Sequence, residues 1–330
     1  MFVGTQYPAK SDLELQILAQ LGVNHICGYP NVKSGFPGGD HKLWSVNFLT
    51  QYKEKVESYG MKVDMLQLPI GHDPQGQSPN IMLGKSPERD REIETCQNIV
   101  RNASLAGIPS VKYRLSSIGI PRTKPSIGRG NSLRSSFYWD QVEDKKSMPE
   151  WAPIAEDESW QRIDYFLKNM VPVAEEYKVR LACHPHDPYT PPGYKGVVRV
   201  LGTIEGLKKF VLMHENKYHG LNFCQGTICE MLENPQTEIF DVIKWFGKRE
   251  KIFNVHFRNI IGKKLAFEET FPDEGDINMF KAAQTYKEIG YKYMLMPDHT
   301  PQMSGPNADG VSFAFCYGYI QGLIQAVNNL

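Results

Sequence analysis

Short apolar runs alternate with longer amphipathic segments along the whole chain, and this alternation predicts strands and helices in turn. The apolar runs that we expect to form strands are residues 2–6, 24–29, 62–68, 110–115, 179–184, 220–224, 251–258 and 293–297. The segments with helical periodicity cover residues 11–21, 45–59, 87–106, 159–177, 203–214, 236–246, 277–289 and 311–327. Every predicted strand is therefore followed by a predicted helix.

Strand–helix units repeated in this way predict an α/β fold, a single (β/α)8 or TIM barrel that forms one domain over residues 1–330. Polar residues at the C-terminal ends of the strands would then meet on one rim, which is where such barrels place their active sites. A doubly wound sheet is the alternative, but it leaves several of the predicted strands unaccounted for.

Two connections, residues 116–157 after the fourth strand and 260–276 after the seventh, are too long to be simple turns. Loops of this length in a compact domain are usually functional lids or disordered segments. The first combines basic residues with aromatics, which favours a lid or insertion on the active-site rim that closes over an anionic substrate. The alternative is a solvated loop whose aromatics pack on the barrel or on a second subunit.

The composition is that of an ordinary globular protein, with 41% hydrophobic and 22% charged residues. Lys plus Arg and Asp plus Glu number 37 each, so the overall charge indicates neither a nucleic-acid nor a membrane partner. The chain has no apolar run long enough to span a bilayer and no signal-peptide pattern at its start, which predicts a cytoplasmic protein. Six cysteines without a CxxC pair argue against a disulfide scaffold and against a zinc knuckle.

Four of the predicted strands end in side chains of metal-binding type. They are His184, Cys224, His256 and Asp298. Imidazole and thiolate ligands with one carboxylate suit Mn²⁺, Fe²⁺, Co²⁺ or Zn²⁺ better than Mg²⁺ or Ca²⁺. A single histidine at a strand end is more often a hydrogen-bonded rim residue, and a buried cysteine is often only a small hydrophobic residue. Four such side chains at four strand ends favour a metal site.

Two histidines next to these positions are candidates for proton transfer. His186 follows His184 by two residues, so strand alternation would turn it to the same side. His299 follows Asp298 directly, and its ordinary pKa of about 6.5 suits a general acid or base. The alternative for His299 is a histidine whose hydrogen bonds are made to the backbone.

Charged and hydroxyl side chains near the same strand ends are candidates for substrate binding. Arg258, two residues beyond His256, could bind a substrate carboxylate or stabilise an enolate, or it could form an ion pair within the rim. Asp187 could orient an imidazole, accept a substrate hydroxyl or cap a turn before Pro188. Tyr113 and Arg114 are weaker candidates. The chain has no GxSxG, GxGxxG or GxxxxGK[ST] motif.

Several short runs resemble those of the mannonate dehydratases, which belong to the xylose-isomerase-like TIM-barrel superfamily. The matching runs are His184-Pro185-His186-Asp187-Pro188, Cys224-Gln225-Gly226-Thr227, His256-Phe257-Arg258, Gly275-Asp276-Ile277-Asn278-Met279 and Pro297-Asp298-His299. They occur in the order and at the spacing found in that family. The chain departs from the family pattern at His186, at Pro301 and from Arg114 onward, so the resemblance is to a divergent member.

The resemblance implies a metal-dependent lyase that eliminates water from a sugar acid or related polyol, as in the conversion of D-mannonate to 2-keto-3-deoxygluconate with Mn²⁺. It implies that the metal is held by His184, Cys224, His256 and Asp298, and that the protein is a homo-oligomer. Two alternatives stay open at this point. One is a metal-dependent sugar isomerase or epimerase of the same superfamily, which returns the proton instead of expelling hydroxide. The other is a barrel that binds its ligand without turnover.

Overall fold

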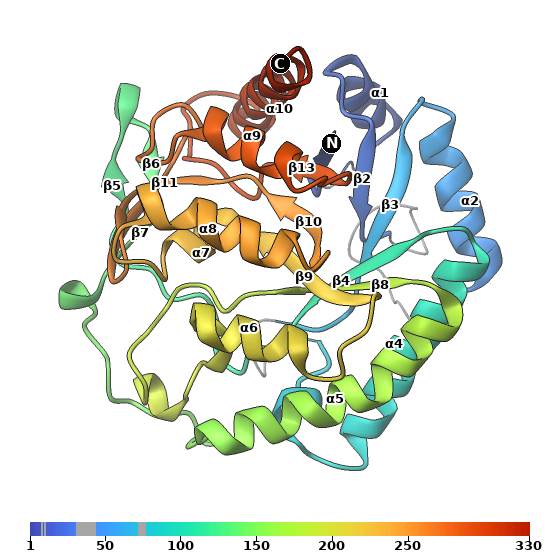
Figure 1. Cartoon of the computed structure of the whole chain (residues 1–330), viewed down its shortest axis with the longest axis vertical. Coiled ribbons are helices and arrows are strands. Elements are labelled where there is room, and N and C mark those ends of the chain that lie inside the picture. The colour runs from blue at the N-terminus through green and yellow to red at the C-terminus, as the bar shows by residue number, and fades with distance from the viewer. Residues whose placement is uncertain (8, 10, 31–43, 72–76) are drawn as a thin grey trace.

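A closed barrel of parallel strands lies at the centre of the molecule (Figure 1). The computed structural model describes residues 1–7, 9, 11–30, 44–71 and 77–330. The barrel strands are β1 (Phe2–Thr5), β2 (His25–Gly28), β3 (Lys62–Gln67), β4 (Ser110–Arg114), β8 (Arg180–His184), β9 (His219–Cys224), β10 (Ile252–His256) and β13 (Met294–Met296). Each pairs with its neighbours in chain order, and β13 closes the barrel against β1. The predicted (β/α)8 barrel is confirmed.

A ring of helices covers the outside of the barrel (Figure 1). The main helices are α1 (Asp12–Gln20), α2 (Val46–Glu57), α4 (Glu88–Leu105), α5 (Glu156–Tyr177), α6 (Ile204–Leu212), α8 (Pro235–Gly247), α9 (Met279–Glu288) and α10 (Ala308–Asn328). They fall where the periodicity predicts them, although α5 begins earlier, because three acidic residues occupy its first turn and favour the helix N-terminus there. Two short helices, α3 (Asn80–Leu83) and α7 (Gln225–Cys229), lie outside the predicted set.

Burial of apolar side chains on both faces of the strands holds the barrel together. One large cluster fills the layer between the strands and the helices, and a smaller cluster fills the barrel interior. The interior cluster contains Cys27, Met65, Ala182, Phe253, Met294 and Met296. Inward-facing side chains of a TIM barrel form such a packed core, so ligands bind on the rim above it.

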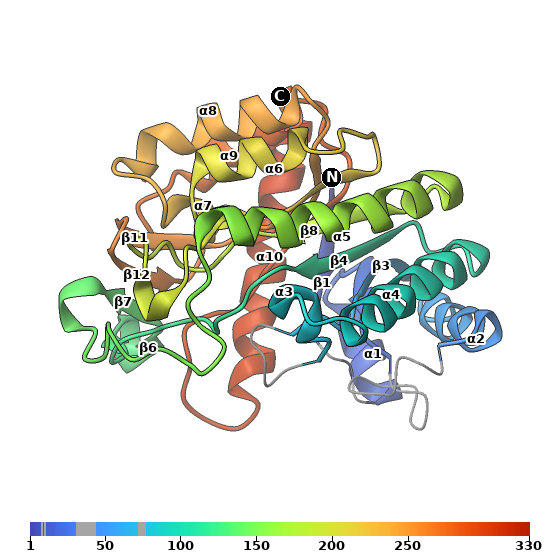
Figure 2. The ribbon, with the colours of Figure 1, turned by 90° about the horizontal axis from the view of Figure 1, so that it is seen from below.

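The two long connections form one ordered structure on the active-site rim. Residues 116–157 carry β5 (Ser126–Ile127), β6 (Leu133–Arg134) and β7 (Ser136–Tyr138), and the connection after β10 carries β11 (Asn259–Lys263) and β12 (Ala266–Thr270). β7 pairs with β12 in a three-stranded antiparallel sheet. Figure 2 shows these strands together on one side of the barrel. Arg134 adds ion pairs to Glu268 (2.9 Å) and Glu274 (2.6 Å), so the two loops support each other.

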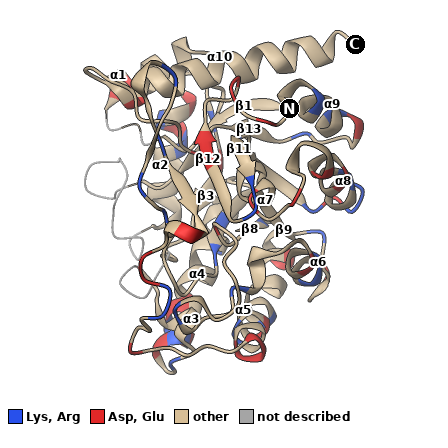
Figure 3. Cartoon of the chain, turned by 90° about the vertical axis from the view of Figure 1, so that its left-hand side faces the viewer, with Lys and Arg blue, Asp and Glu red and all other residues tan. Residues whose placement is uncertain are grey.

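Charged side chains are spread over the molecule rather than gathered on one element. On the side seen in Figure 3, segments of both signs alternate along the helices and loops. This distribution agrees with equal numbers of acidic and basic residues in the sequence. None of the described helices is both long enough and apolar enough to cross a membrane.

Candidate active site

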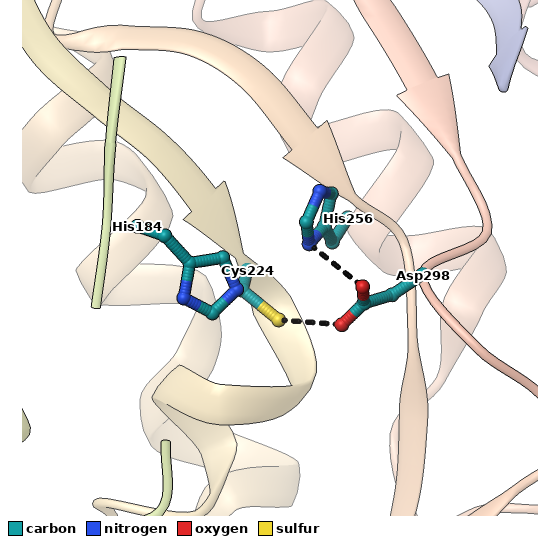
Figure 4. A group of neighbouring side chains, drawn as sticks. All are labelled: His184, Cys224, His256 and Asp298. Atoms are coloured by element: carbon teal, nitrogen blue, oxygen red, sulfur yellow. Dashed lines mark hydrogen bonds and ion pairs between the residues drawn. The ribbon is translucent and has the colours of Figure 1, made fainter. Parts of the chain in front are cut away.

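The four predicted metal ligands lie together at the C-terminal ends of β8, β9, β10 and β13. One donor atom from each of His184, Cys224, His256 and Asp298 lies within 4.8 Å of the donor atoms of the other three. His256 Nδ1 is 3.2 Å from one carboxylate oxygen of Asp298, and Cys224 Sγ is 3.6 Å from the other. Figure 4 shows the four side chains pointing toward one another. Sequence reasoning predicts this grouping correctly.

The register of the barrel brings these side chains to one level. His256 pairs with Cys224 across β10 and β9, and with Met296 across β10 and β13. Asp298 follows Met296 by two residues and returns to the same side. Parallel strands that end at the same height therefore present their last residues around one point.

Hydrogen bonds orient both histidines. His184 Nδ1 lies 2.7 Å from the carbonyl oxygen of Pro185, so this nitrogen donates its proton there and Nε2 keeps its lone pair. His256 Nε2 lies 3.1 Å from the side-chain amide of Asn222, which is in turn 2.5 Å from the amide of Asn254. Asn222 Nδ2 faces His256 Nε2, and Asn222 Oδ1 accepts from Asn254 Nδ2. Ligation through Nδ1 of His256 would require a proton on Nε2, which the Asn222 oxygen accepts once this amide is turned over.

The four side chains fit a divalent transition metal. Burial, and then the neighbouring His256 and Arg114, lower the pKa of His184. Burial also lowers the pKa of His256, which favours the neutral form of the imidazole that ligates metals. Burial raises the pKa of the Cys224 thiol, whereas a bound cation would favour the thiolate. Two imidazoles, a thiolate and a carboxylate match the borderline metals.

Replacement of Asn222 by alanine should weaken metal binding without removing a ligand. The amide of Asn222 orients the His256 ring, and loss of such an outer partner typically lowers metal affinity by about 10- to 100-fold. Titration of the metal-free protein with Mn²⁺ measures the change. Asn254→Ala, which removes an amide one step further from the ring, serves as the control and should change the affinity less. Equal losses in the two variants would contradict this role of Asn222.

A buried cluster of charges lies beside the metal-ligand group. Arg258 Nη2 is 2.6 Å from Glu230 and 3.2 Å from Asp187, and its Nη1 is 3.1 Å from Glu269. Arg122, from the long connection after β4, adds contacts of 2.7 Å to Asp187 and 2.5 Å to Glu269. All five side chains are largely or fully buried. The charge pairs thus hold the connection that follows β4 onto the rim.

Arg258 does not take the position expected of a substrate anchor. Its guanidinium is 1% exposed and is surrounded by the carboxylates of the protein itself. These carboxylates raise the pKa of Arg258 despite its burial. The ion-pair alternative is the one that the structure shows. Asp187 likewise contacts Arg122, Arg258 and the Thr227 hydroxyl (2.9 Å), so it orients groups of the protein.

Asp187, Glu269 and His299 form a second group with metal-ligand geometry among the described residues. Two guanidiniums, those of Arg122 and Arg258, already contact both carboxylates of this group. The positive charge that a cation would supply is therefore present in the protein, and the arrangement is better described as an ion-pair network.

His299 lies at the edge of this network with its side chain 43% exposed. Its Nδ1 contacts Glu269, and its Nε2 is 2.9 Å from Arg258 Nη1 and 3.3 Å from Asp298. Although burial opposes the charged form, Glu269 and then Asp298 raise the pKa of His299. An accessible imidazole next to a predicted metal ligand has the location expected of a group that exchanges protons with a bound substrate.

The prediction that His186 points to the same site is wrong. Its Nε2 lies 2.6 Å from the carbonyl oxygen of Leu115, and its Nδ1 accepts from the backbone amide of Leu201 at 3.3 Å. Burial lowers the pKa of His186 to about 3, so the ring stays neutral. β8 ends at His184, and the alternation of side chains therefore no longer applies two residues later. His186 thus links the backbone after β4, at Leu115, to the backbone at Leu201 through its two ring nitrogens.

Tyr113 and Arg114, adjacent on β4, point in opposite directions. Tyr113 is 2% exposed and packs in the layer between barrel and helices, with its ring 5.2 Å from that of Phe166. This places Tyr113 away from the rim, which corrects its prediction as a substrate contact. Arg114 is the register partner of His184 and lines a cavity beside the metal-ligand group.

This cavity has a volume of about 450 Å³, within the range of small-molecule sites. Its polar lining includes Gln6, Gln67, Lys112, Arg114 and Asp298. Sequence reasoning gave no role to several polar residues in and around the site, namely Gln6, Lys112, Glu230 and Glu269. A charged residue inside an otherwise apolar strand, such as Lys112, is the signal that could have indicated one of them.

Comparison with known proteins identifies the family. Residues 132–330, more than half of the chain, match the D-mannonate dehydratase (UxuA) family. The chain belongs to this family. A mannonate dehydratase from Streptococcus agalactiae serotype Ia is 27% identical over 318 residues, which cover 87% of this chain and 88% of the relative. The protein is therefore a hydro-lyase of the mannonate dehydratase type, as its motifs predict.

Solved structures agree with this assignment at the level of the fold. The crystal structure of mannonate dehydratase from Streptococcus suis serotype 2 superposes with a TM-score of 0.82 and 23% sequence identity, covering 99% of this chain and 95% of the other. A D-psicose 3-epimerase from Clostridium cellulolyticum H10 gives a TM-score of 0.61 with 11% identity, covering 100% of this chain and 99% of the other. The barrel is thus shared with epimerases, whereas the sequence match is to dehydratases.

Proposed function

We propose that the protein removes water from a six-carbon sugar acid to give a 2-keto-3-deoxy acid, and that D-mannonate is the first substrate to test. The observation that carries the proposal is the convergence of His184, Cys224, His256 and Asp298 in a chain of the mannonate dehydratase family. We assign Mn²⁺ to these ligands, with Fe²⁺, Co²⁺ and Zn²⁺ as the other metals that the donor set suits. When bound, the metal supplies a Lewis acid that makes the proton on C2 of the substrate easier to remove.

The residues around the metal ligands divide the remaining work. His299 is accessible, and we give it proton transfer with the substrate, so that the C2 proton and the C3 hydroxyl leave together as water. The resulting enol becomes the 2-keto product. Glu269 contacts Nδ1 of the His299 ring and holds its orientation, while Arg258 contacts Nε2. Proton transfer through Nε2 requires His299 to exchange its contact with Arg258 for one with the substrate. Asp187 acts through Arg122 and Arg258 rather than on the substrate.

The proposal also covers the compartment, the oligomeric state and the partners of the protein. We infer that it works in the cytoplasm, as a homo-oligomer, without a nucleic-acid or membrane partner. We also propose that residues 116–157 act as a lid, since Arg122 connects them to the charge cluster at the site.

The reaction is tested with protein stripped of metal and then reloaded with Mn²⁺. We expect 2-keto-3-deoxy product from D-mannonate with Mn²⁺ and none after chelation, measured by an assay for 2-keto-3-deoxy acids. A panel of other aldonates and uronates defines the preferred substrate. Product formation that is independent of metal would contradict the proposal. Metal-dependent change of sugar stereochemistry without loss of water would favour the isomerase or epimerase instead.

A further inference from the structure

The cavity beside the metal-ligand group is built mostly by the other half of the barrel. The predicted metal ligands come from the ends of β8, β9, β10 and β13, which lie next to β1 to β4 in the closed barrel (Figure 1). The cavity is lined mostly by residues of β1 to β4 and the segments that follow them, with Asp309 and Phe313 of α10 added. Asp298 belongs to both, because it is a metal ligand and also lines the cavity. A substrate in the cavity would therefore be in contact with the metal centre.

A lysine inside a barrel strand is the unusual feature of this cavity. Lys112 lies on β4, is 3% exposed and lines the cavity, and Arg114 is two residues further on the same face. Lysine is rarely buried without a charged partner. Among the described residues, Lys112 forms no ion pair with a carboxylate within 4.0 Å. Its Nζ instead donates to the neutral side-chain amide of Gln6.

Gln6 connects this ammonium group to the metal centre. Its amide oxygen accepts from Lys112, and its amide nitrogen donates to Asp298 Oδ1 at 2.8 Å and to the Asp298 carbonyl oxygen at 3.2 Å. A lysine can only donate and a carboxylate can only accept, so the two neighbours fix the orientation of the amide. The chain from Lys112 through Gln6 to Asp298 sets the position of the ammonium relative to the metal ligands.

Lys112 and Arg114 are the cationic side chains that line the cavity from β4. Lys55 also lines the cavity, but it pairs with Asp12 at 2.8 Å. Arg122 and Arg258 are already paired with Asp187, Glu230 and Glu269. A thiolate and a carboxylate from the metal ligands balance the charge of a divalent ion, so the metal centre itself carries no net charge. Burial lowers the pKa of Lys112, and an anion in the cavity would favour its charged form.

We infer that Lys112, with the neighbouring charge of Arg114, forms the site that binds the carboxylate of the substrate. This inference rests on the proposed sugar-acid substrate and names the residue that selects acids over neutral sugars. The role expected of Arg258 from the sequence is thereby transferred to β4. The cavity also offers the amide of Gln67 and tyrosine rings on its wall, which suit the hydroxyl groups of a polyol.

Binding of an inert substrate analogue tests the inference without turnover. The probes are the 3-deoxy analogue of D-mannonate, which has no C3 hydroxyl to lose, and the corresponding uncharged 3-deoxyalditol. We expect calorimetry on Mn²⁺-loaded protein to show at least about 10-fold tighter binding of the acid, as for one charge-assisted hydrogen bond. Lys112→Met should reduce this preference to within about 3-fold, and Lys112→Arg should keep most of it.

Two controls make the result specific. Lys251→Met removes another buried lysine, from the opposite end of the barrel before β10, and should leave both affinities unchanged. The Mn²⁺ affinity of Lys112→Met should stay within about 3-fold of the original, because among the described contacts Lys112 reaches the metal ligands through Gln6. Equal loss of acid and alditol binding, an unchanged preference in Lys112→Met, or no preference in the original protein would each overturn the inference.

The outcome is separable from that of the proposed reaction. Binding that depends on Lys112 in a protein that does not dehydrate any aldonate would support the inference and contradict the proposed function. Dehydration of D-mannonate with an unchanged KM in Lys112→Met would support the proposed function and contradict the inference about Lys112.

Discussion

His256→Ala is expected to abolish both metal retention and the formation of 2-keto-3-deoxy product. His256 is 1% exposed and contributes one of only four donors, and its Nδ1 faces Asp298 at 3.2 Å. Since loss of an outer hydrogen-bond partner already lowers metal affinity by about 10- to 100-fold, loss of a ligand should cost at least about 100-fold. Metal analysis after gel filtration, together with the turnover assay, measures the effect.

The control for this variant is another buried histidine of the same barrel. His219 begins β9 at the opposite end of the strands, and its Nε2 contacts the carbonyl oxygen of Phe210 at 2.9 Å. His219→Ala removes an imidazole of equal burial and should keep the metal. Retention of stoichiometric Mn²⁺ by His256→Ala, with activity near that of the original protein, would show that the metal binds elsewhere.

Arg258→Met is expected to lower the free energy of unfolding by about 3–5 kcal/mol. The guanidinium is the main partner of Glu230 and a shared partner of Asp187 and Glu269. Removing one member of a buried ion pair leaves an uncompensated charge, which costs about this much. Burial, and then the charge of Asp187, raise the pKa of Glu230, whereas Arg258 and Arg122 oppose this rise. Urea unfolding followed by circular dichroism gives the value.

A double variant separates charge from packing in this prediction. In Arg258→Met/Glu230→Met the carboxylate at 2.6 Å is removed with its partner, and Asp187 and Glu269 keep Arg122 as their cationic partner. We expect the double variant to recover at least about 1 kcal/mol relative to the single one. A loss below about 1 kcal/mol in the single variant, or strictly additive losses, would contradict the role given to this pair.

The sequence predicts the barrel and the metal ligands because both depend on local patterns. Apolar runs followed by amphipathic segments define strand–helix units, and a parallel barrel brings every strand end to one rim. His184, Cys224 and His256 are the last residues of their strands, so their position follows from the strand boundaries alone.

The incorrect prediction for His186 has a physical cause. Side chains alternate only while the chain is extended, and His186 lies two residues beyond the end of its strand. Arg258 also lies two residues beyond a strand, but its Nη1 does reach Asp298 at 3.5 Å. There the chain turns, and tertiary contacts decide the direction of each side chain. Asp298 also lies beyond its strand yet returns to the site, so alternation by itself does not separate these cases.

The structure of the two long connections could not be predicted, because it depends on contacts between segments that are distant in the sequence. β7 pairs with β12 across more than a hundred residues of sequence, and Arg122 reaches Glu269 over a similar separation. Short strands in long loops carry little periodicity, so neither contact follows from a local pattern. Lys112 was missed because attention to strand ends overlooks a charged residue in the middle of a strand.

The absorption spectrum of the Co²⁺-substituted protein tests the metal centre most directly. Ligation by Cys224 predicts an intense thiolate-to-metal charge-transfer band that appears in proportion to bound Co²⁺ and is absent in Cys224→Ser, while the weaker bands of the metal ion persist with the remaining ligands. The same charge-transfer band in Cys224→Ser, or failure of the original protein to bind Co²⁺ at all, would contradict the four-ligand centre on which this account rests.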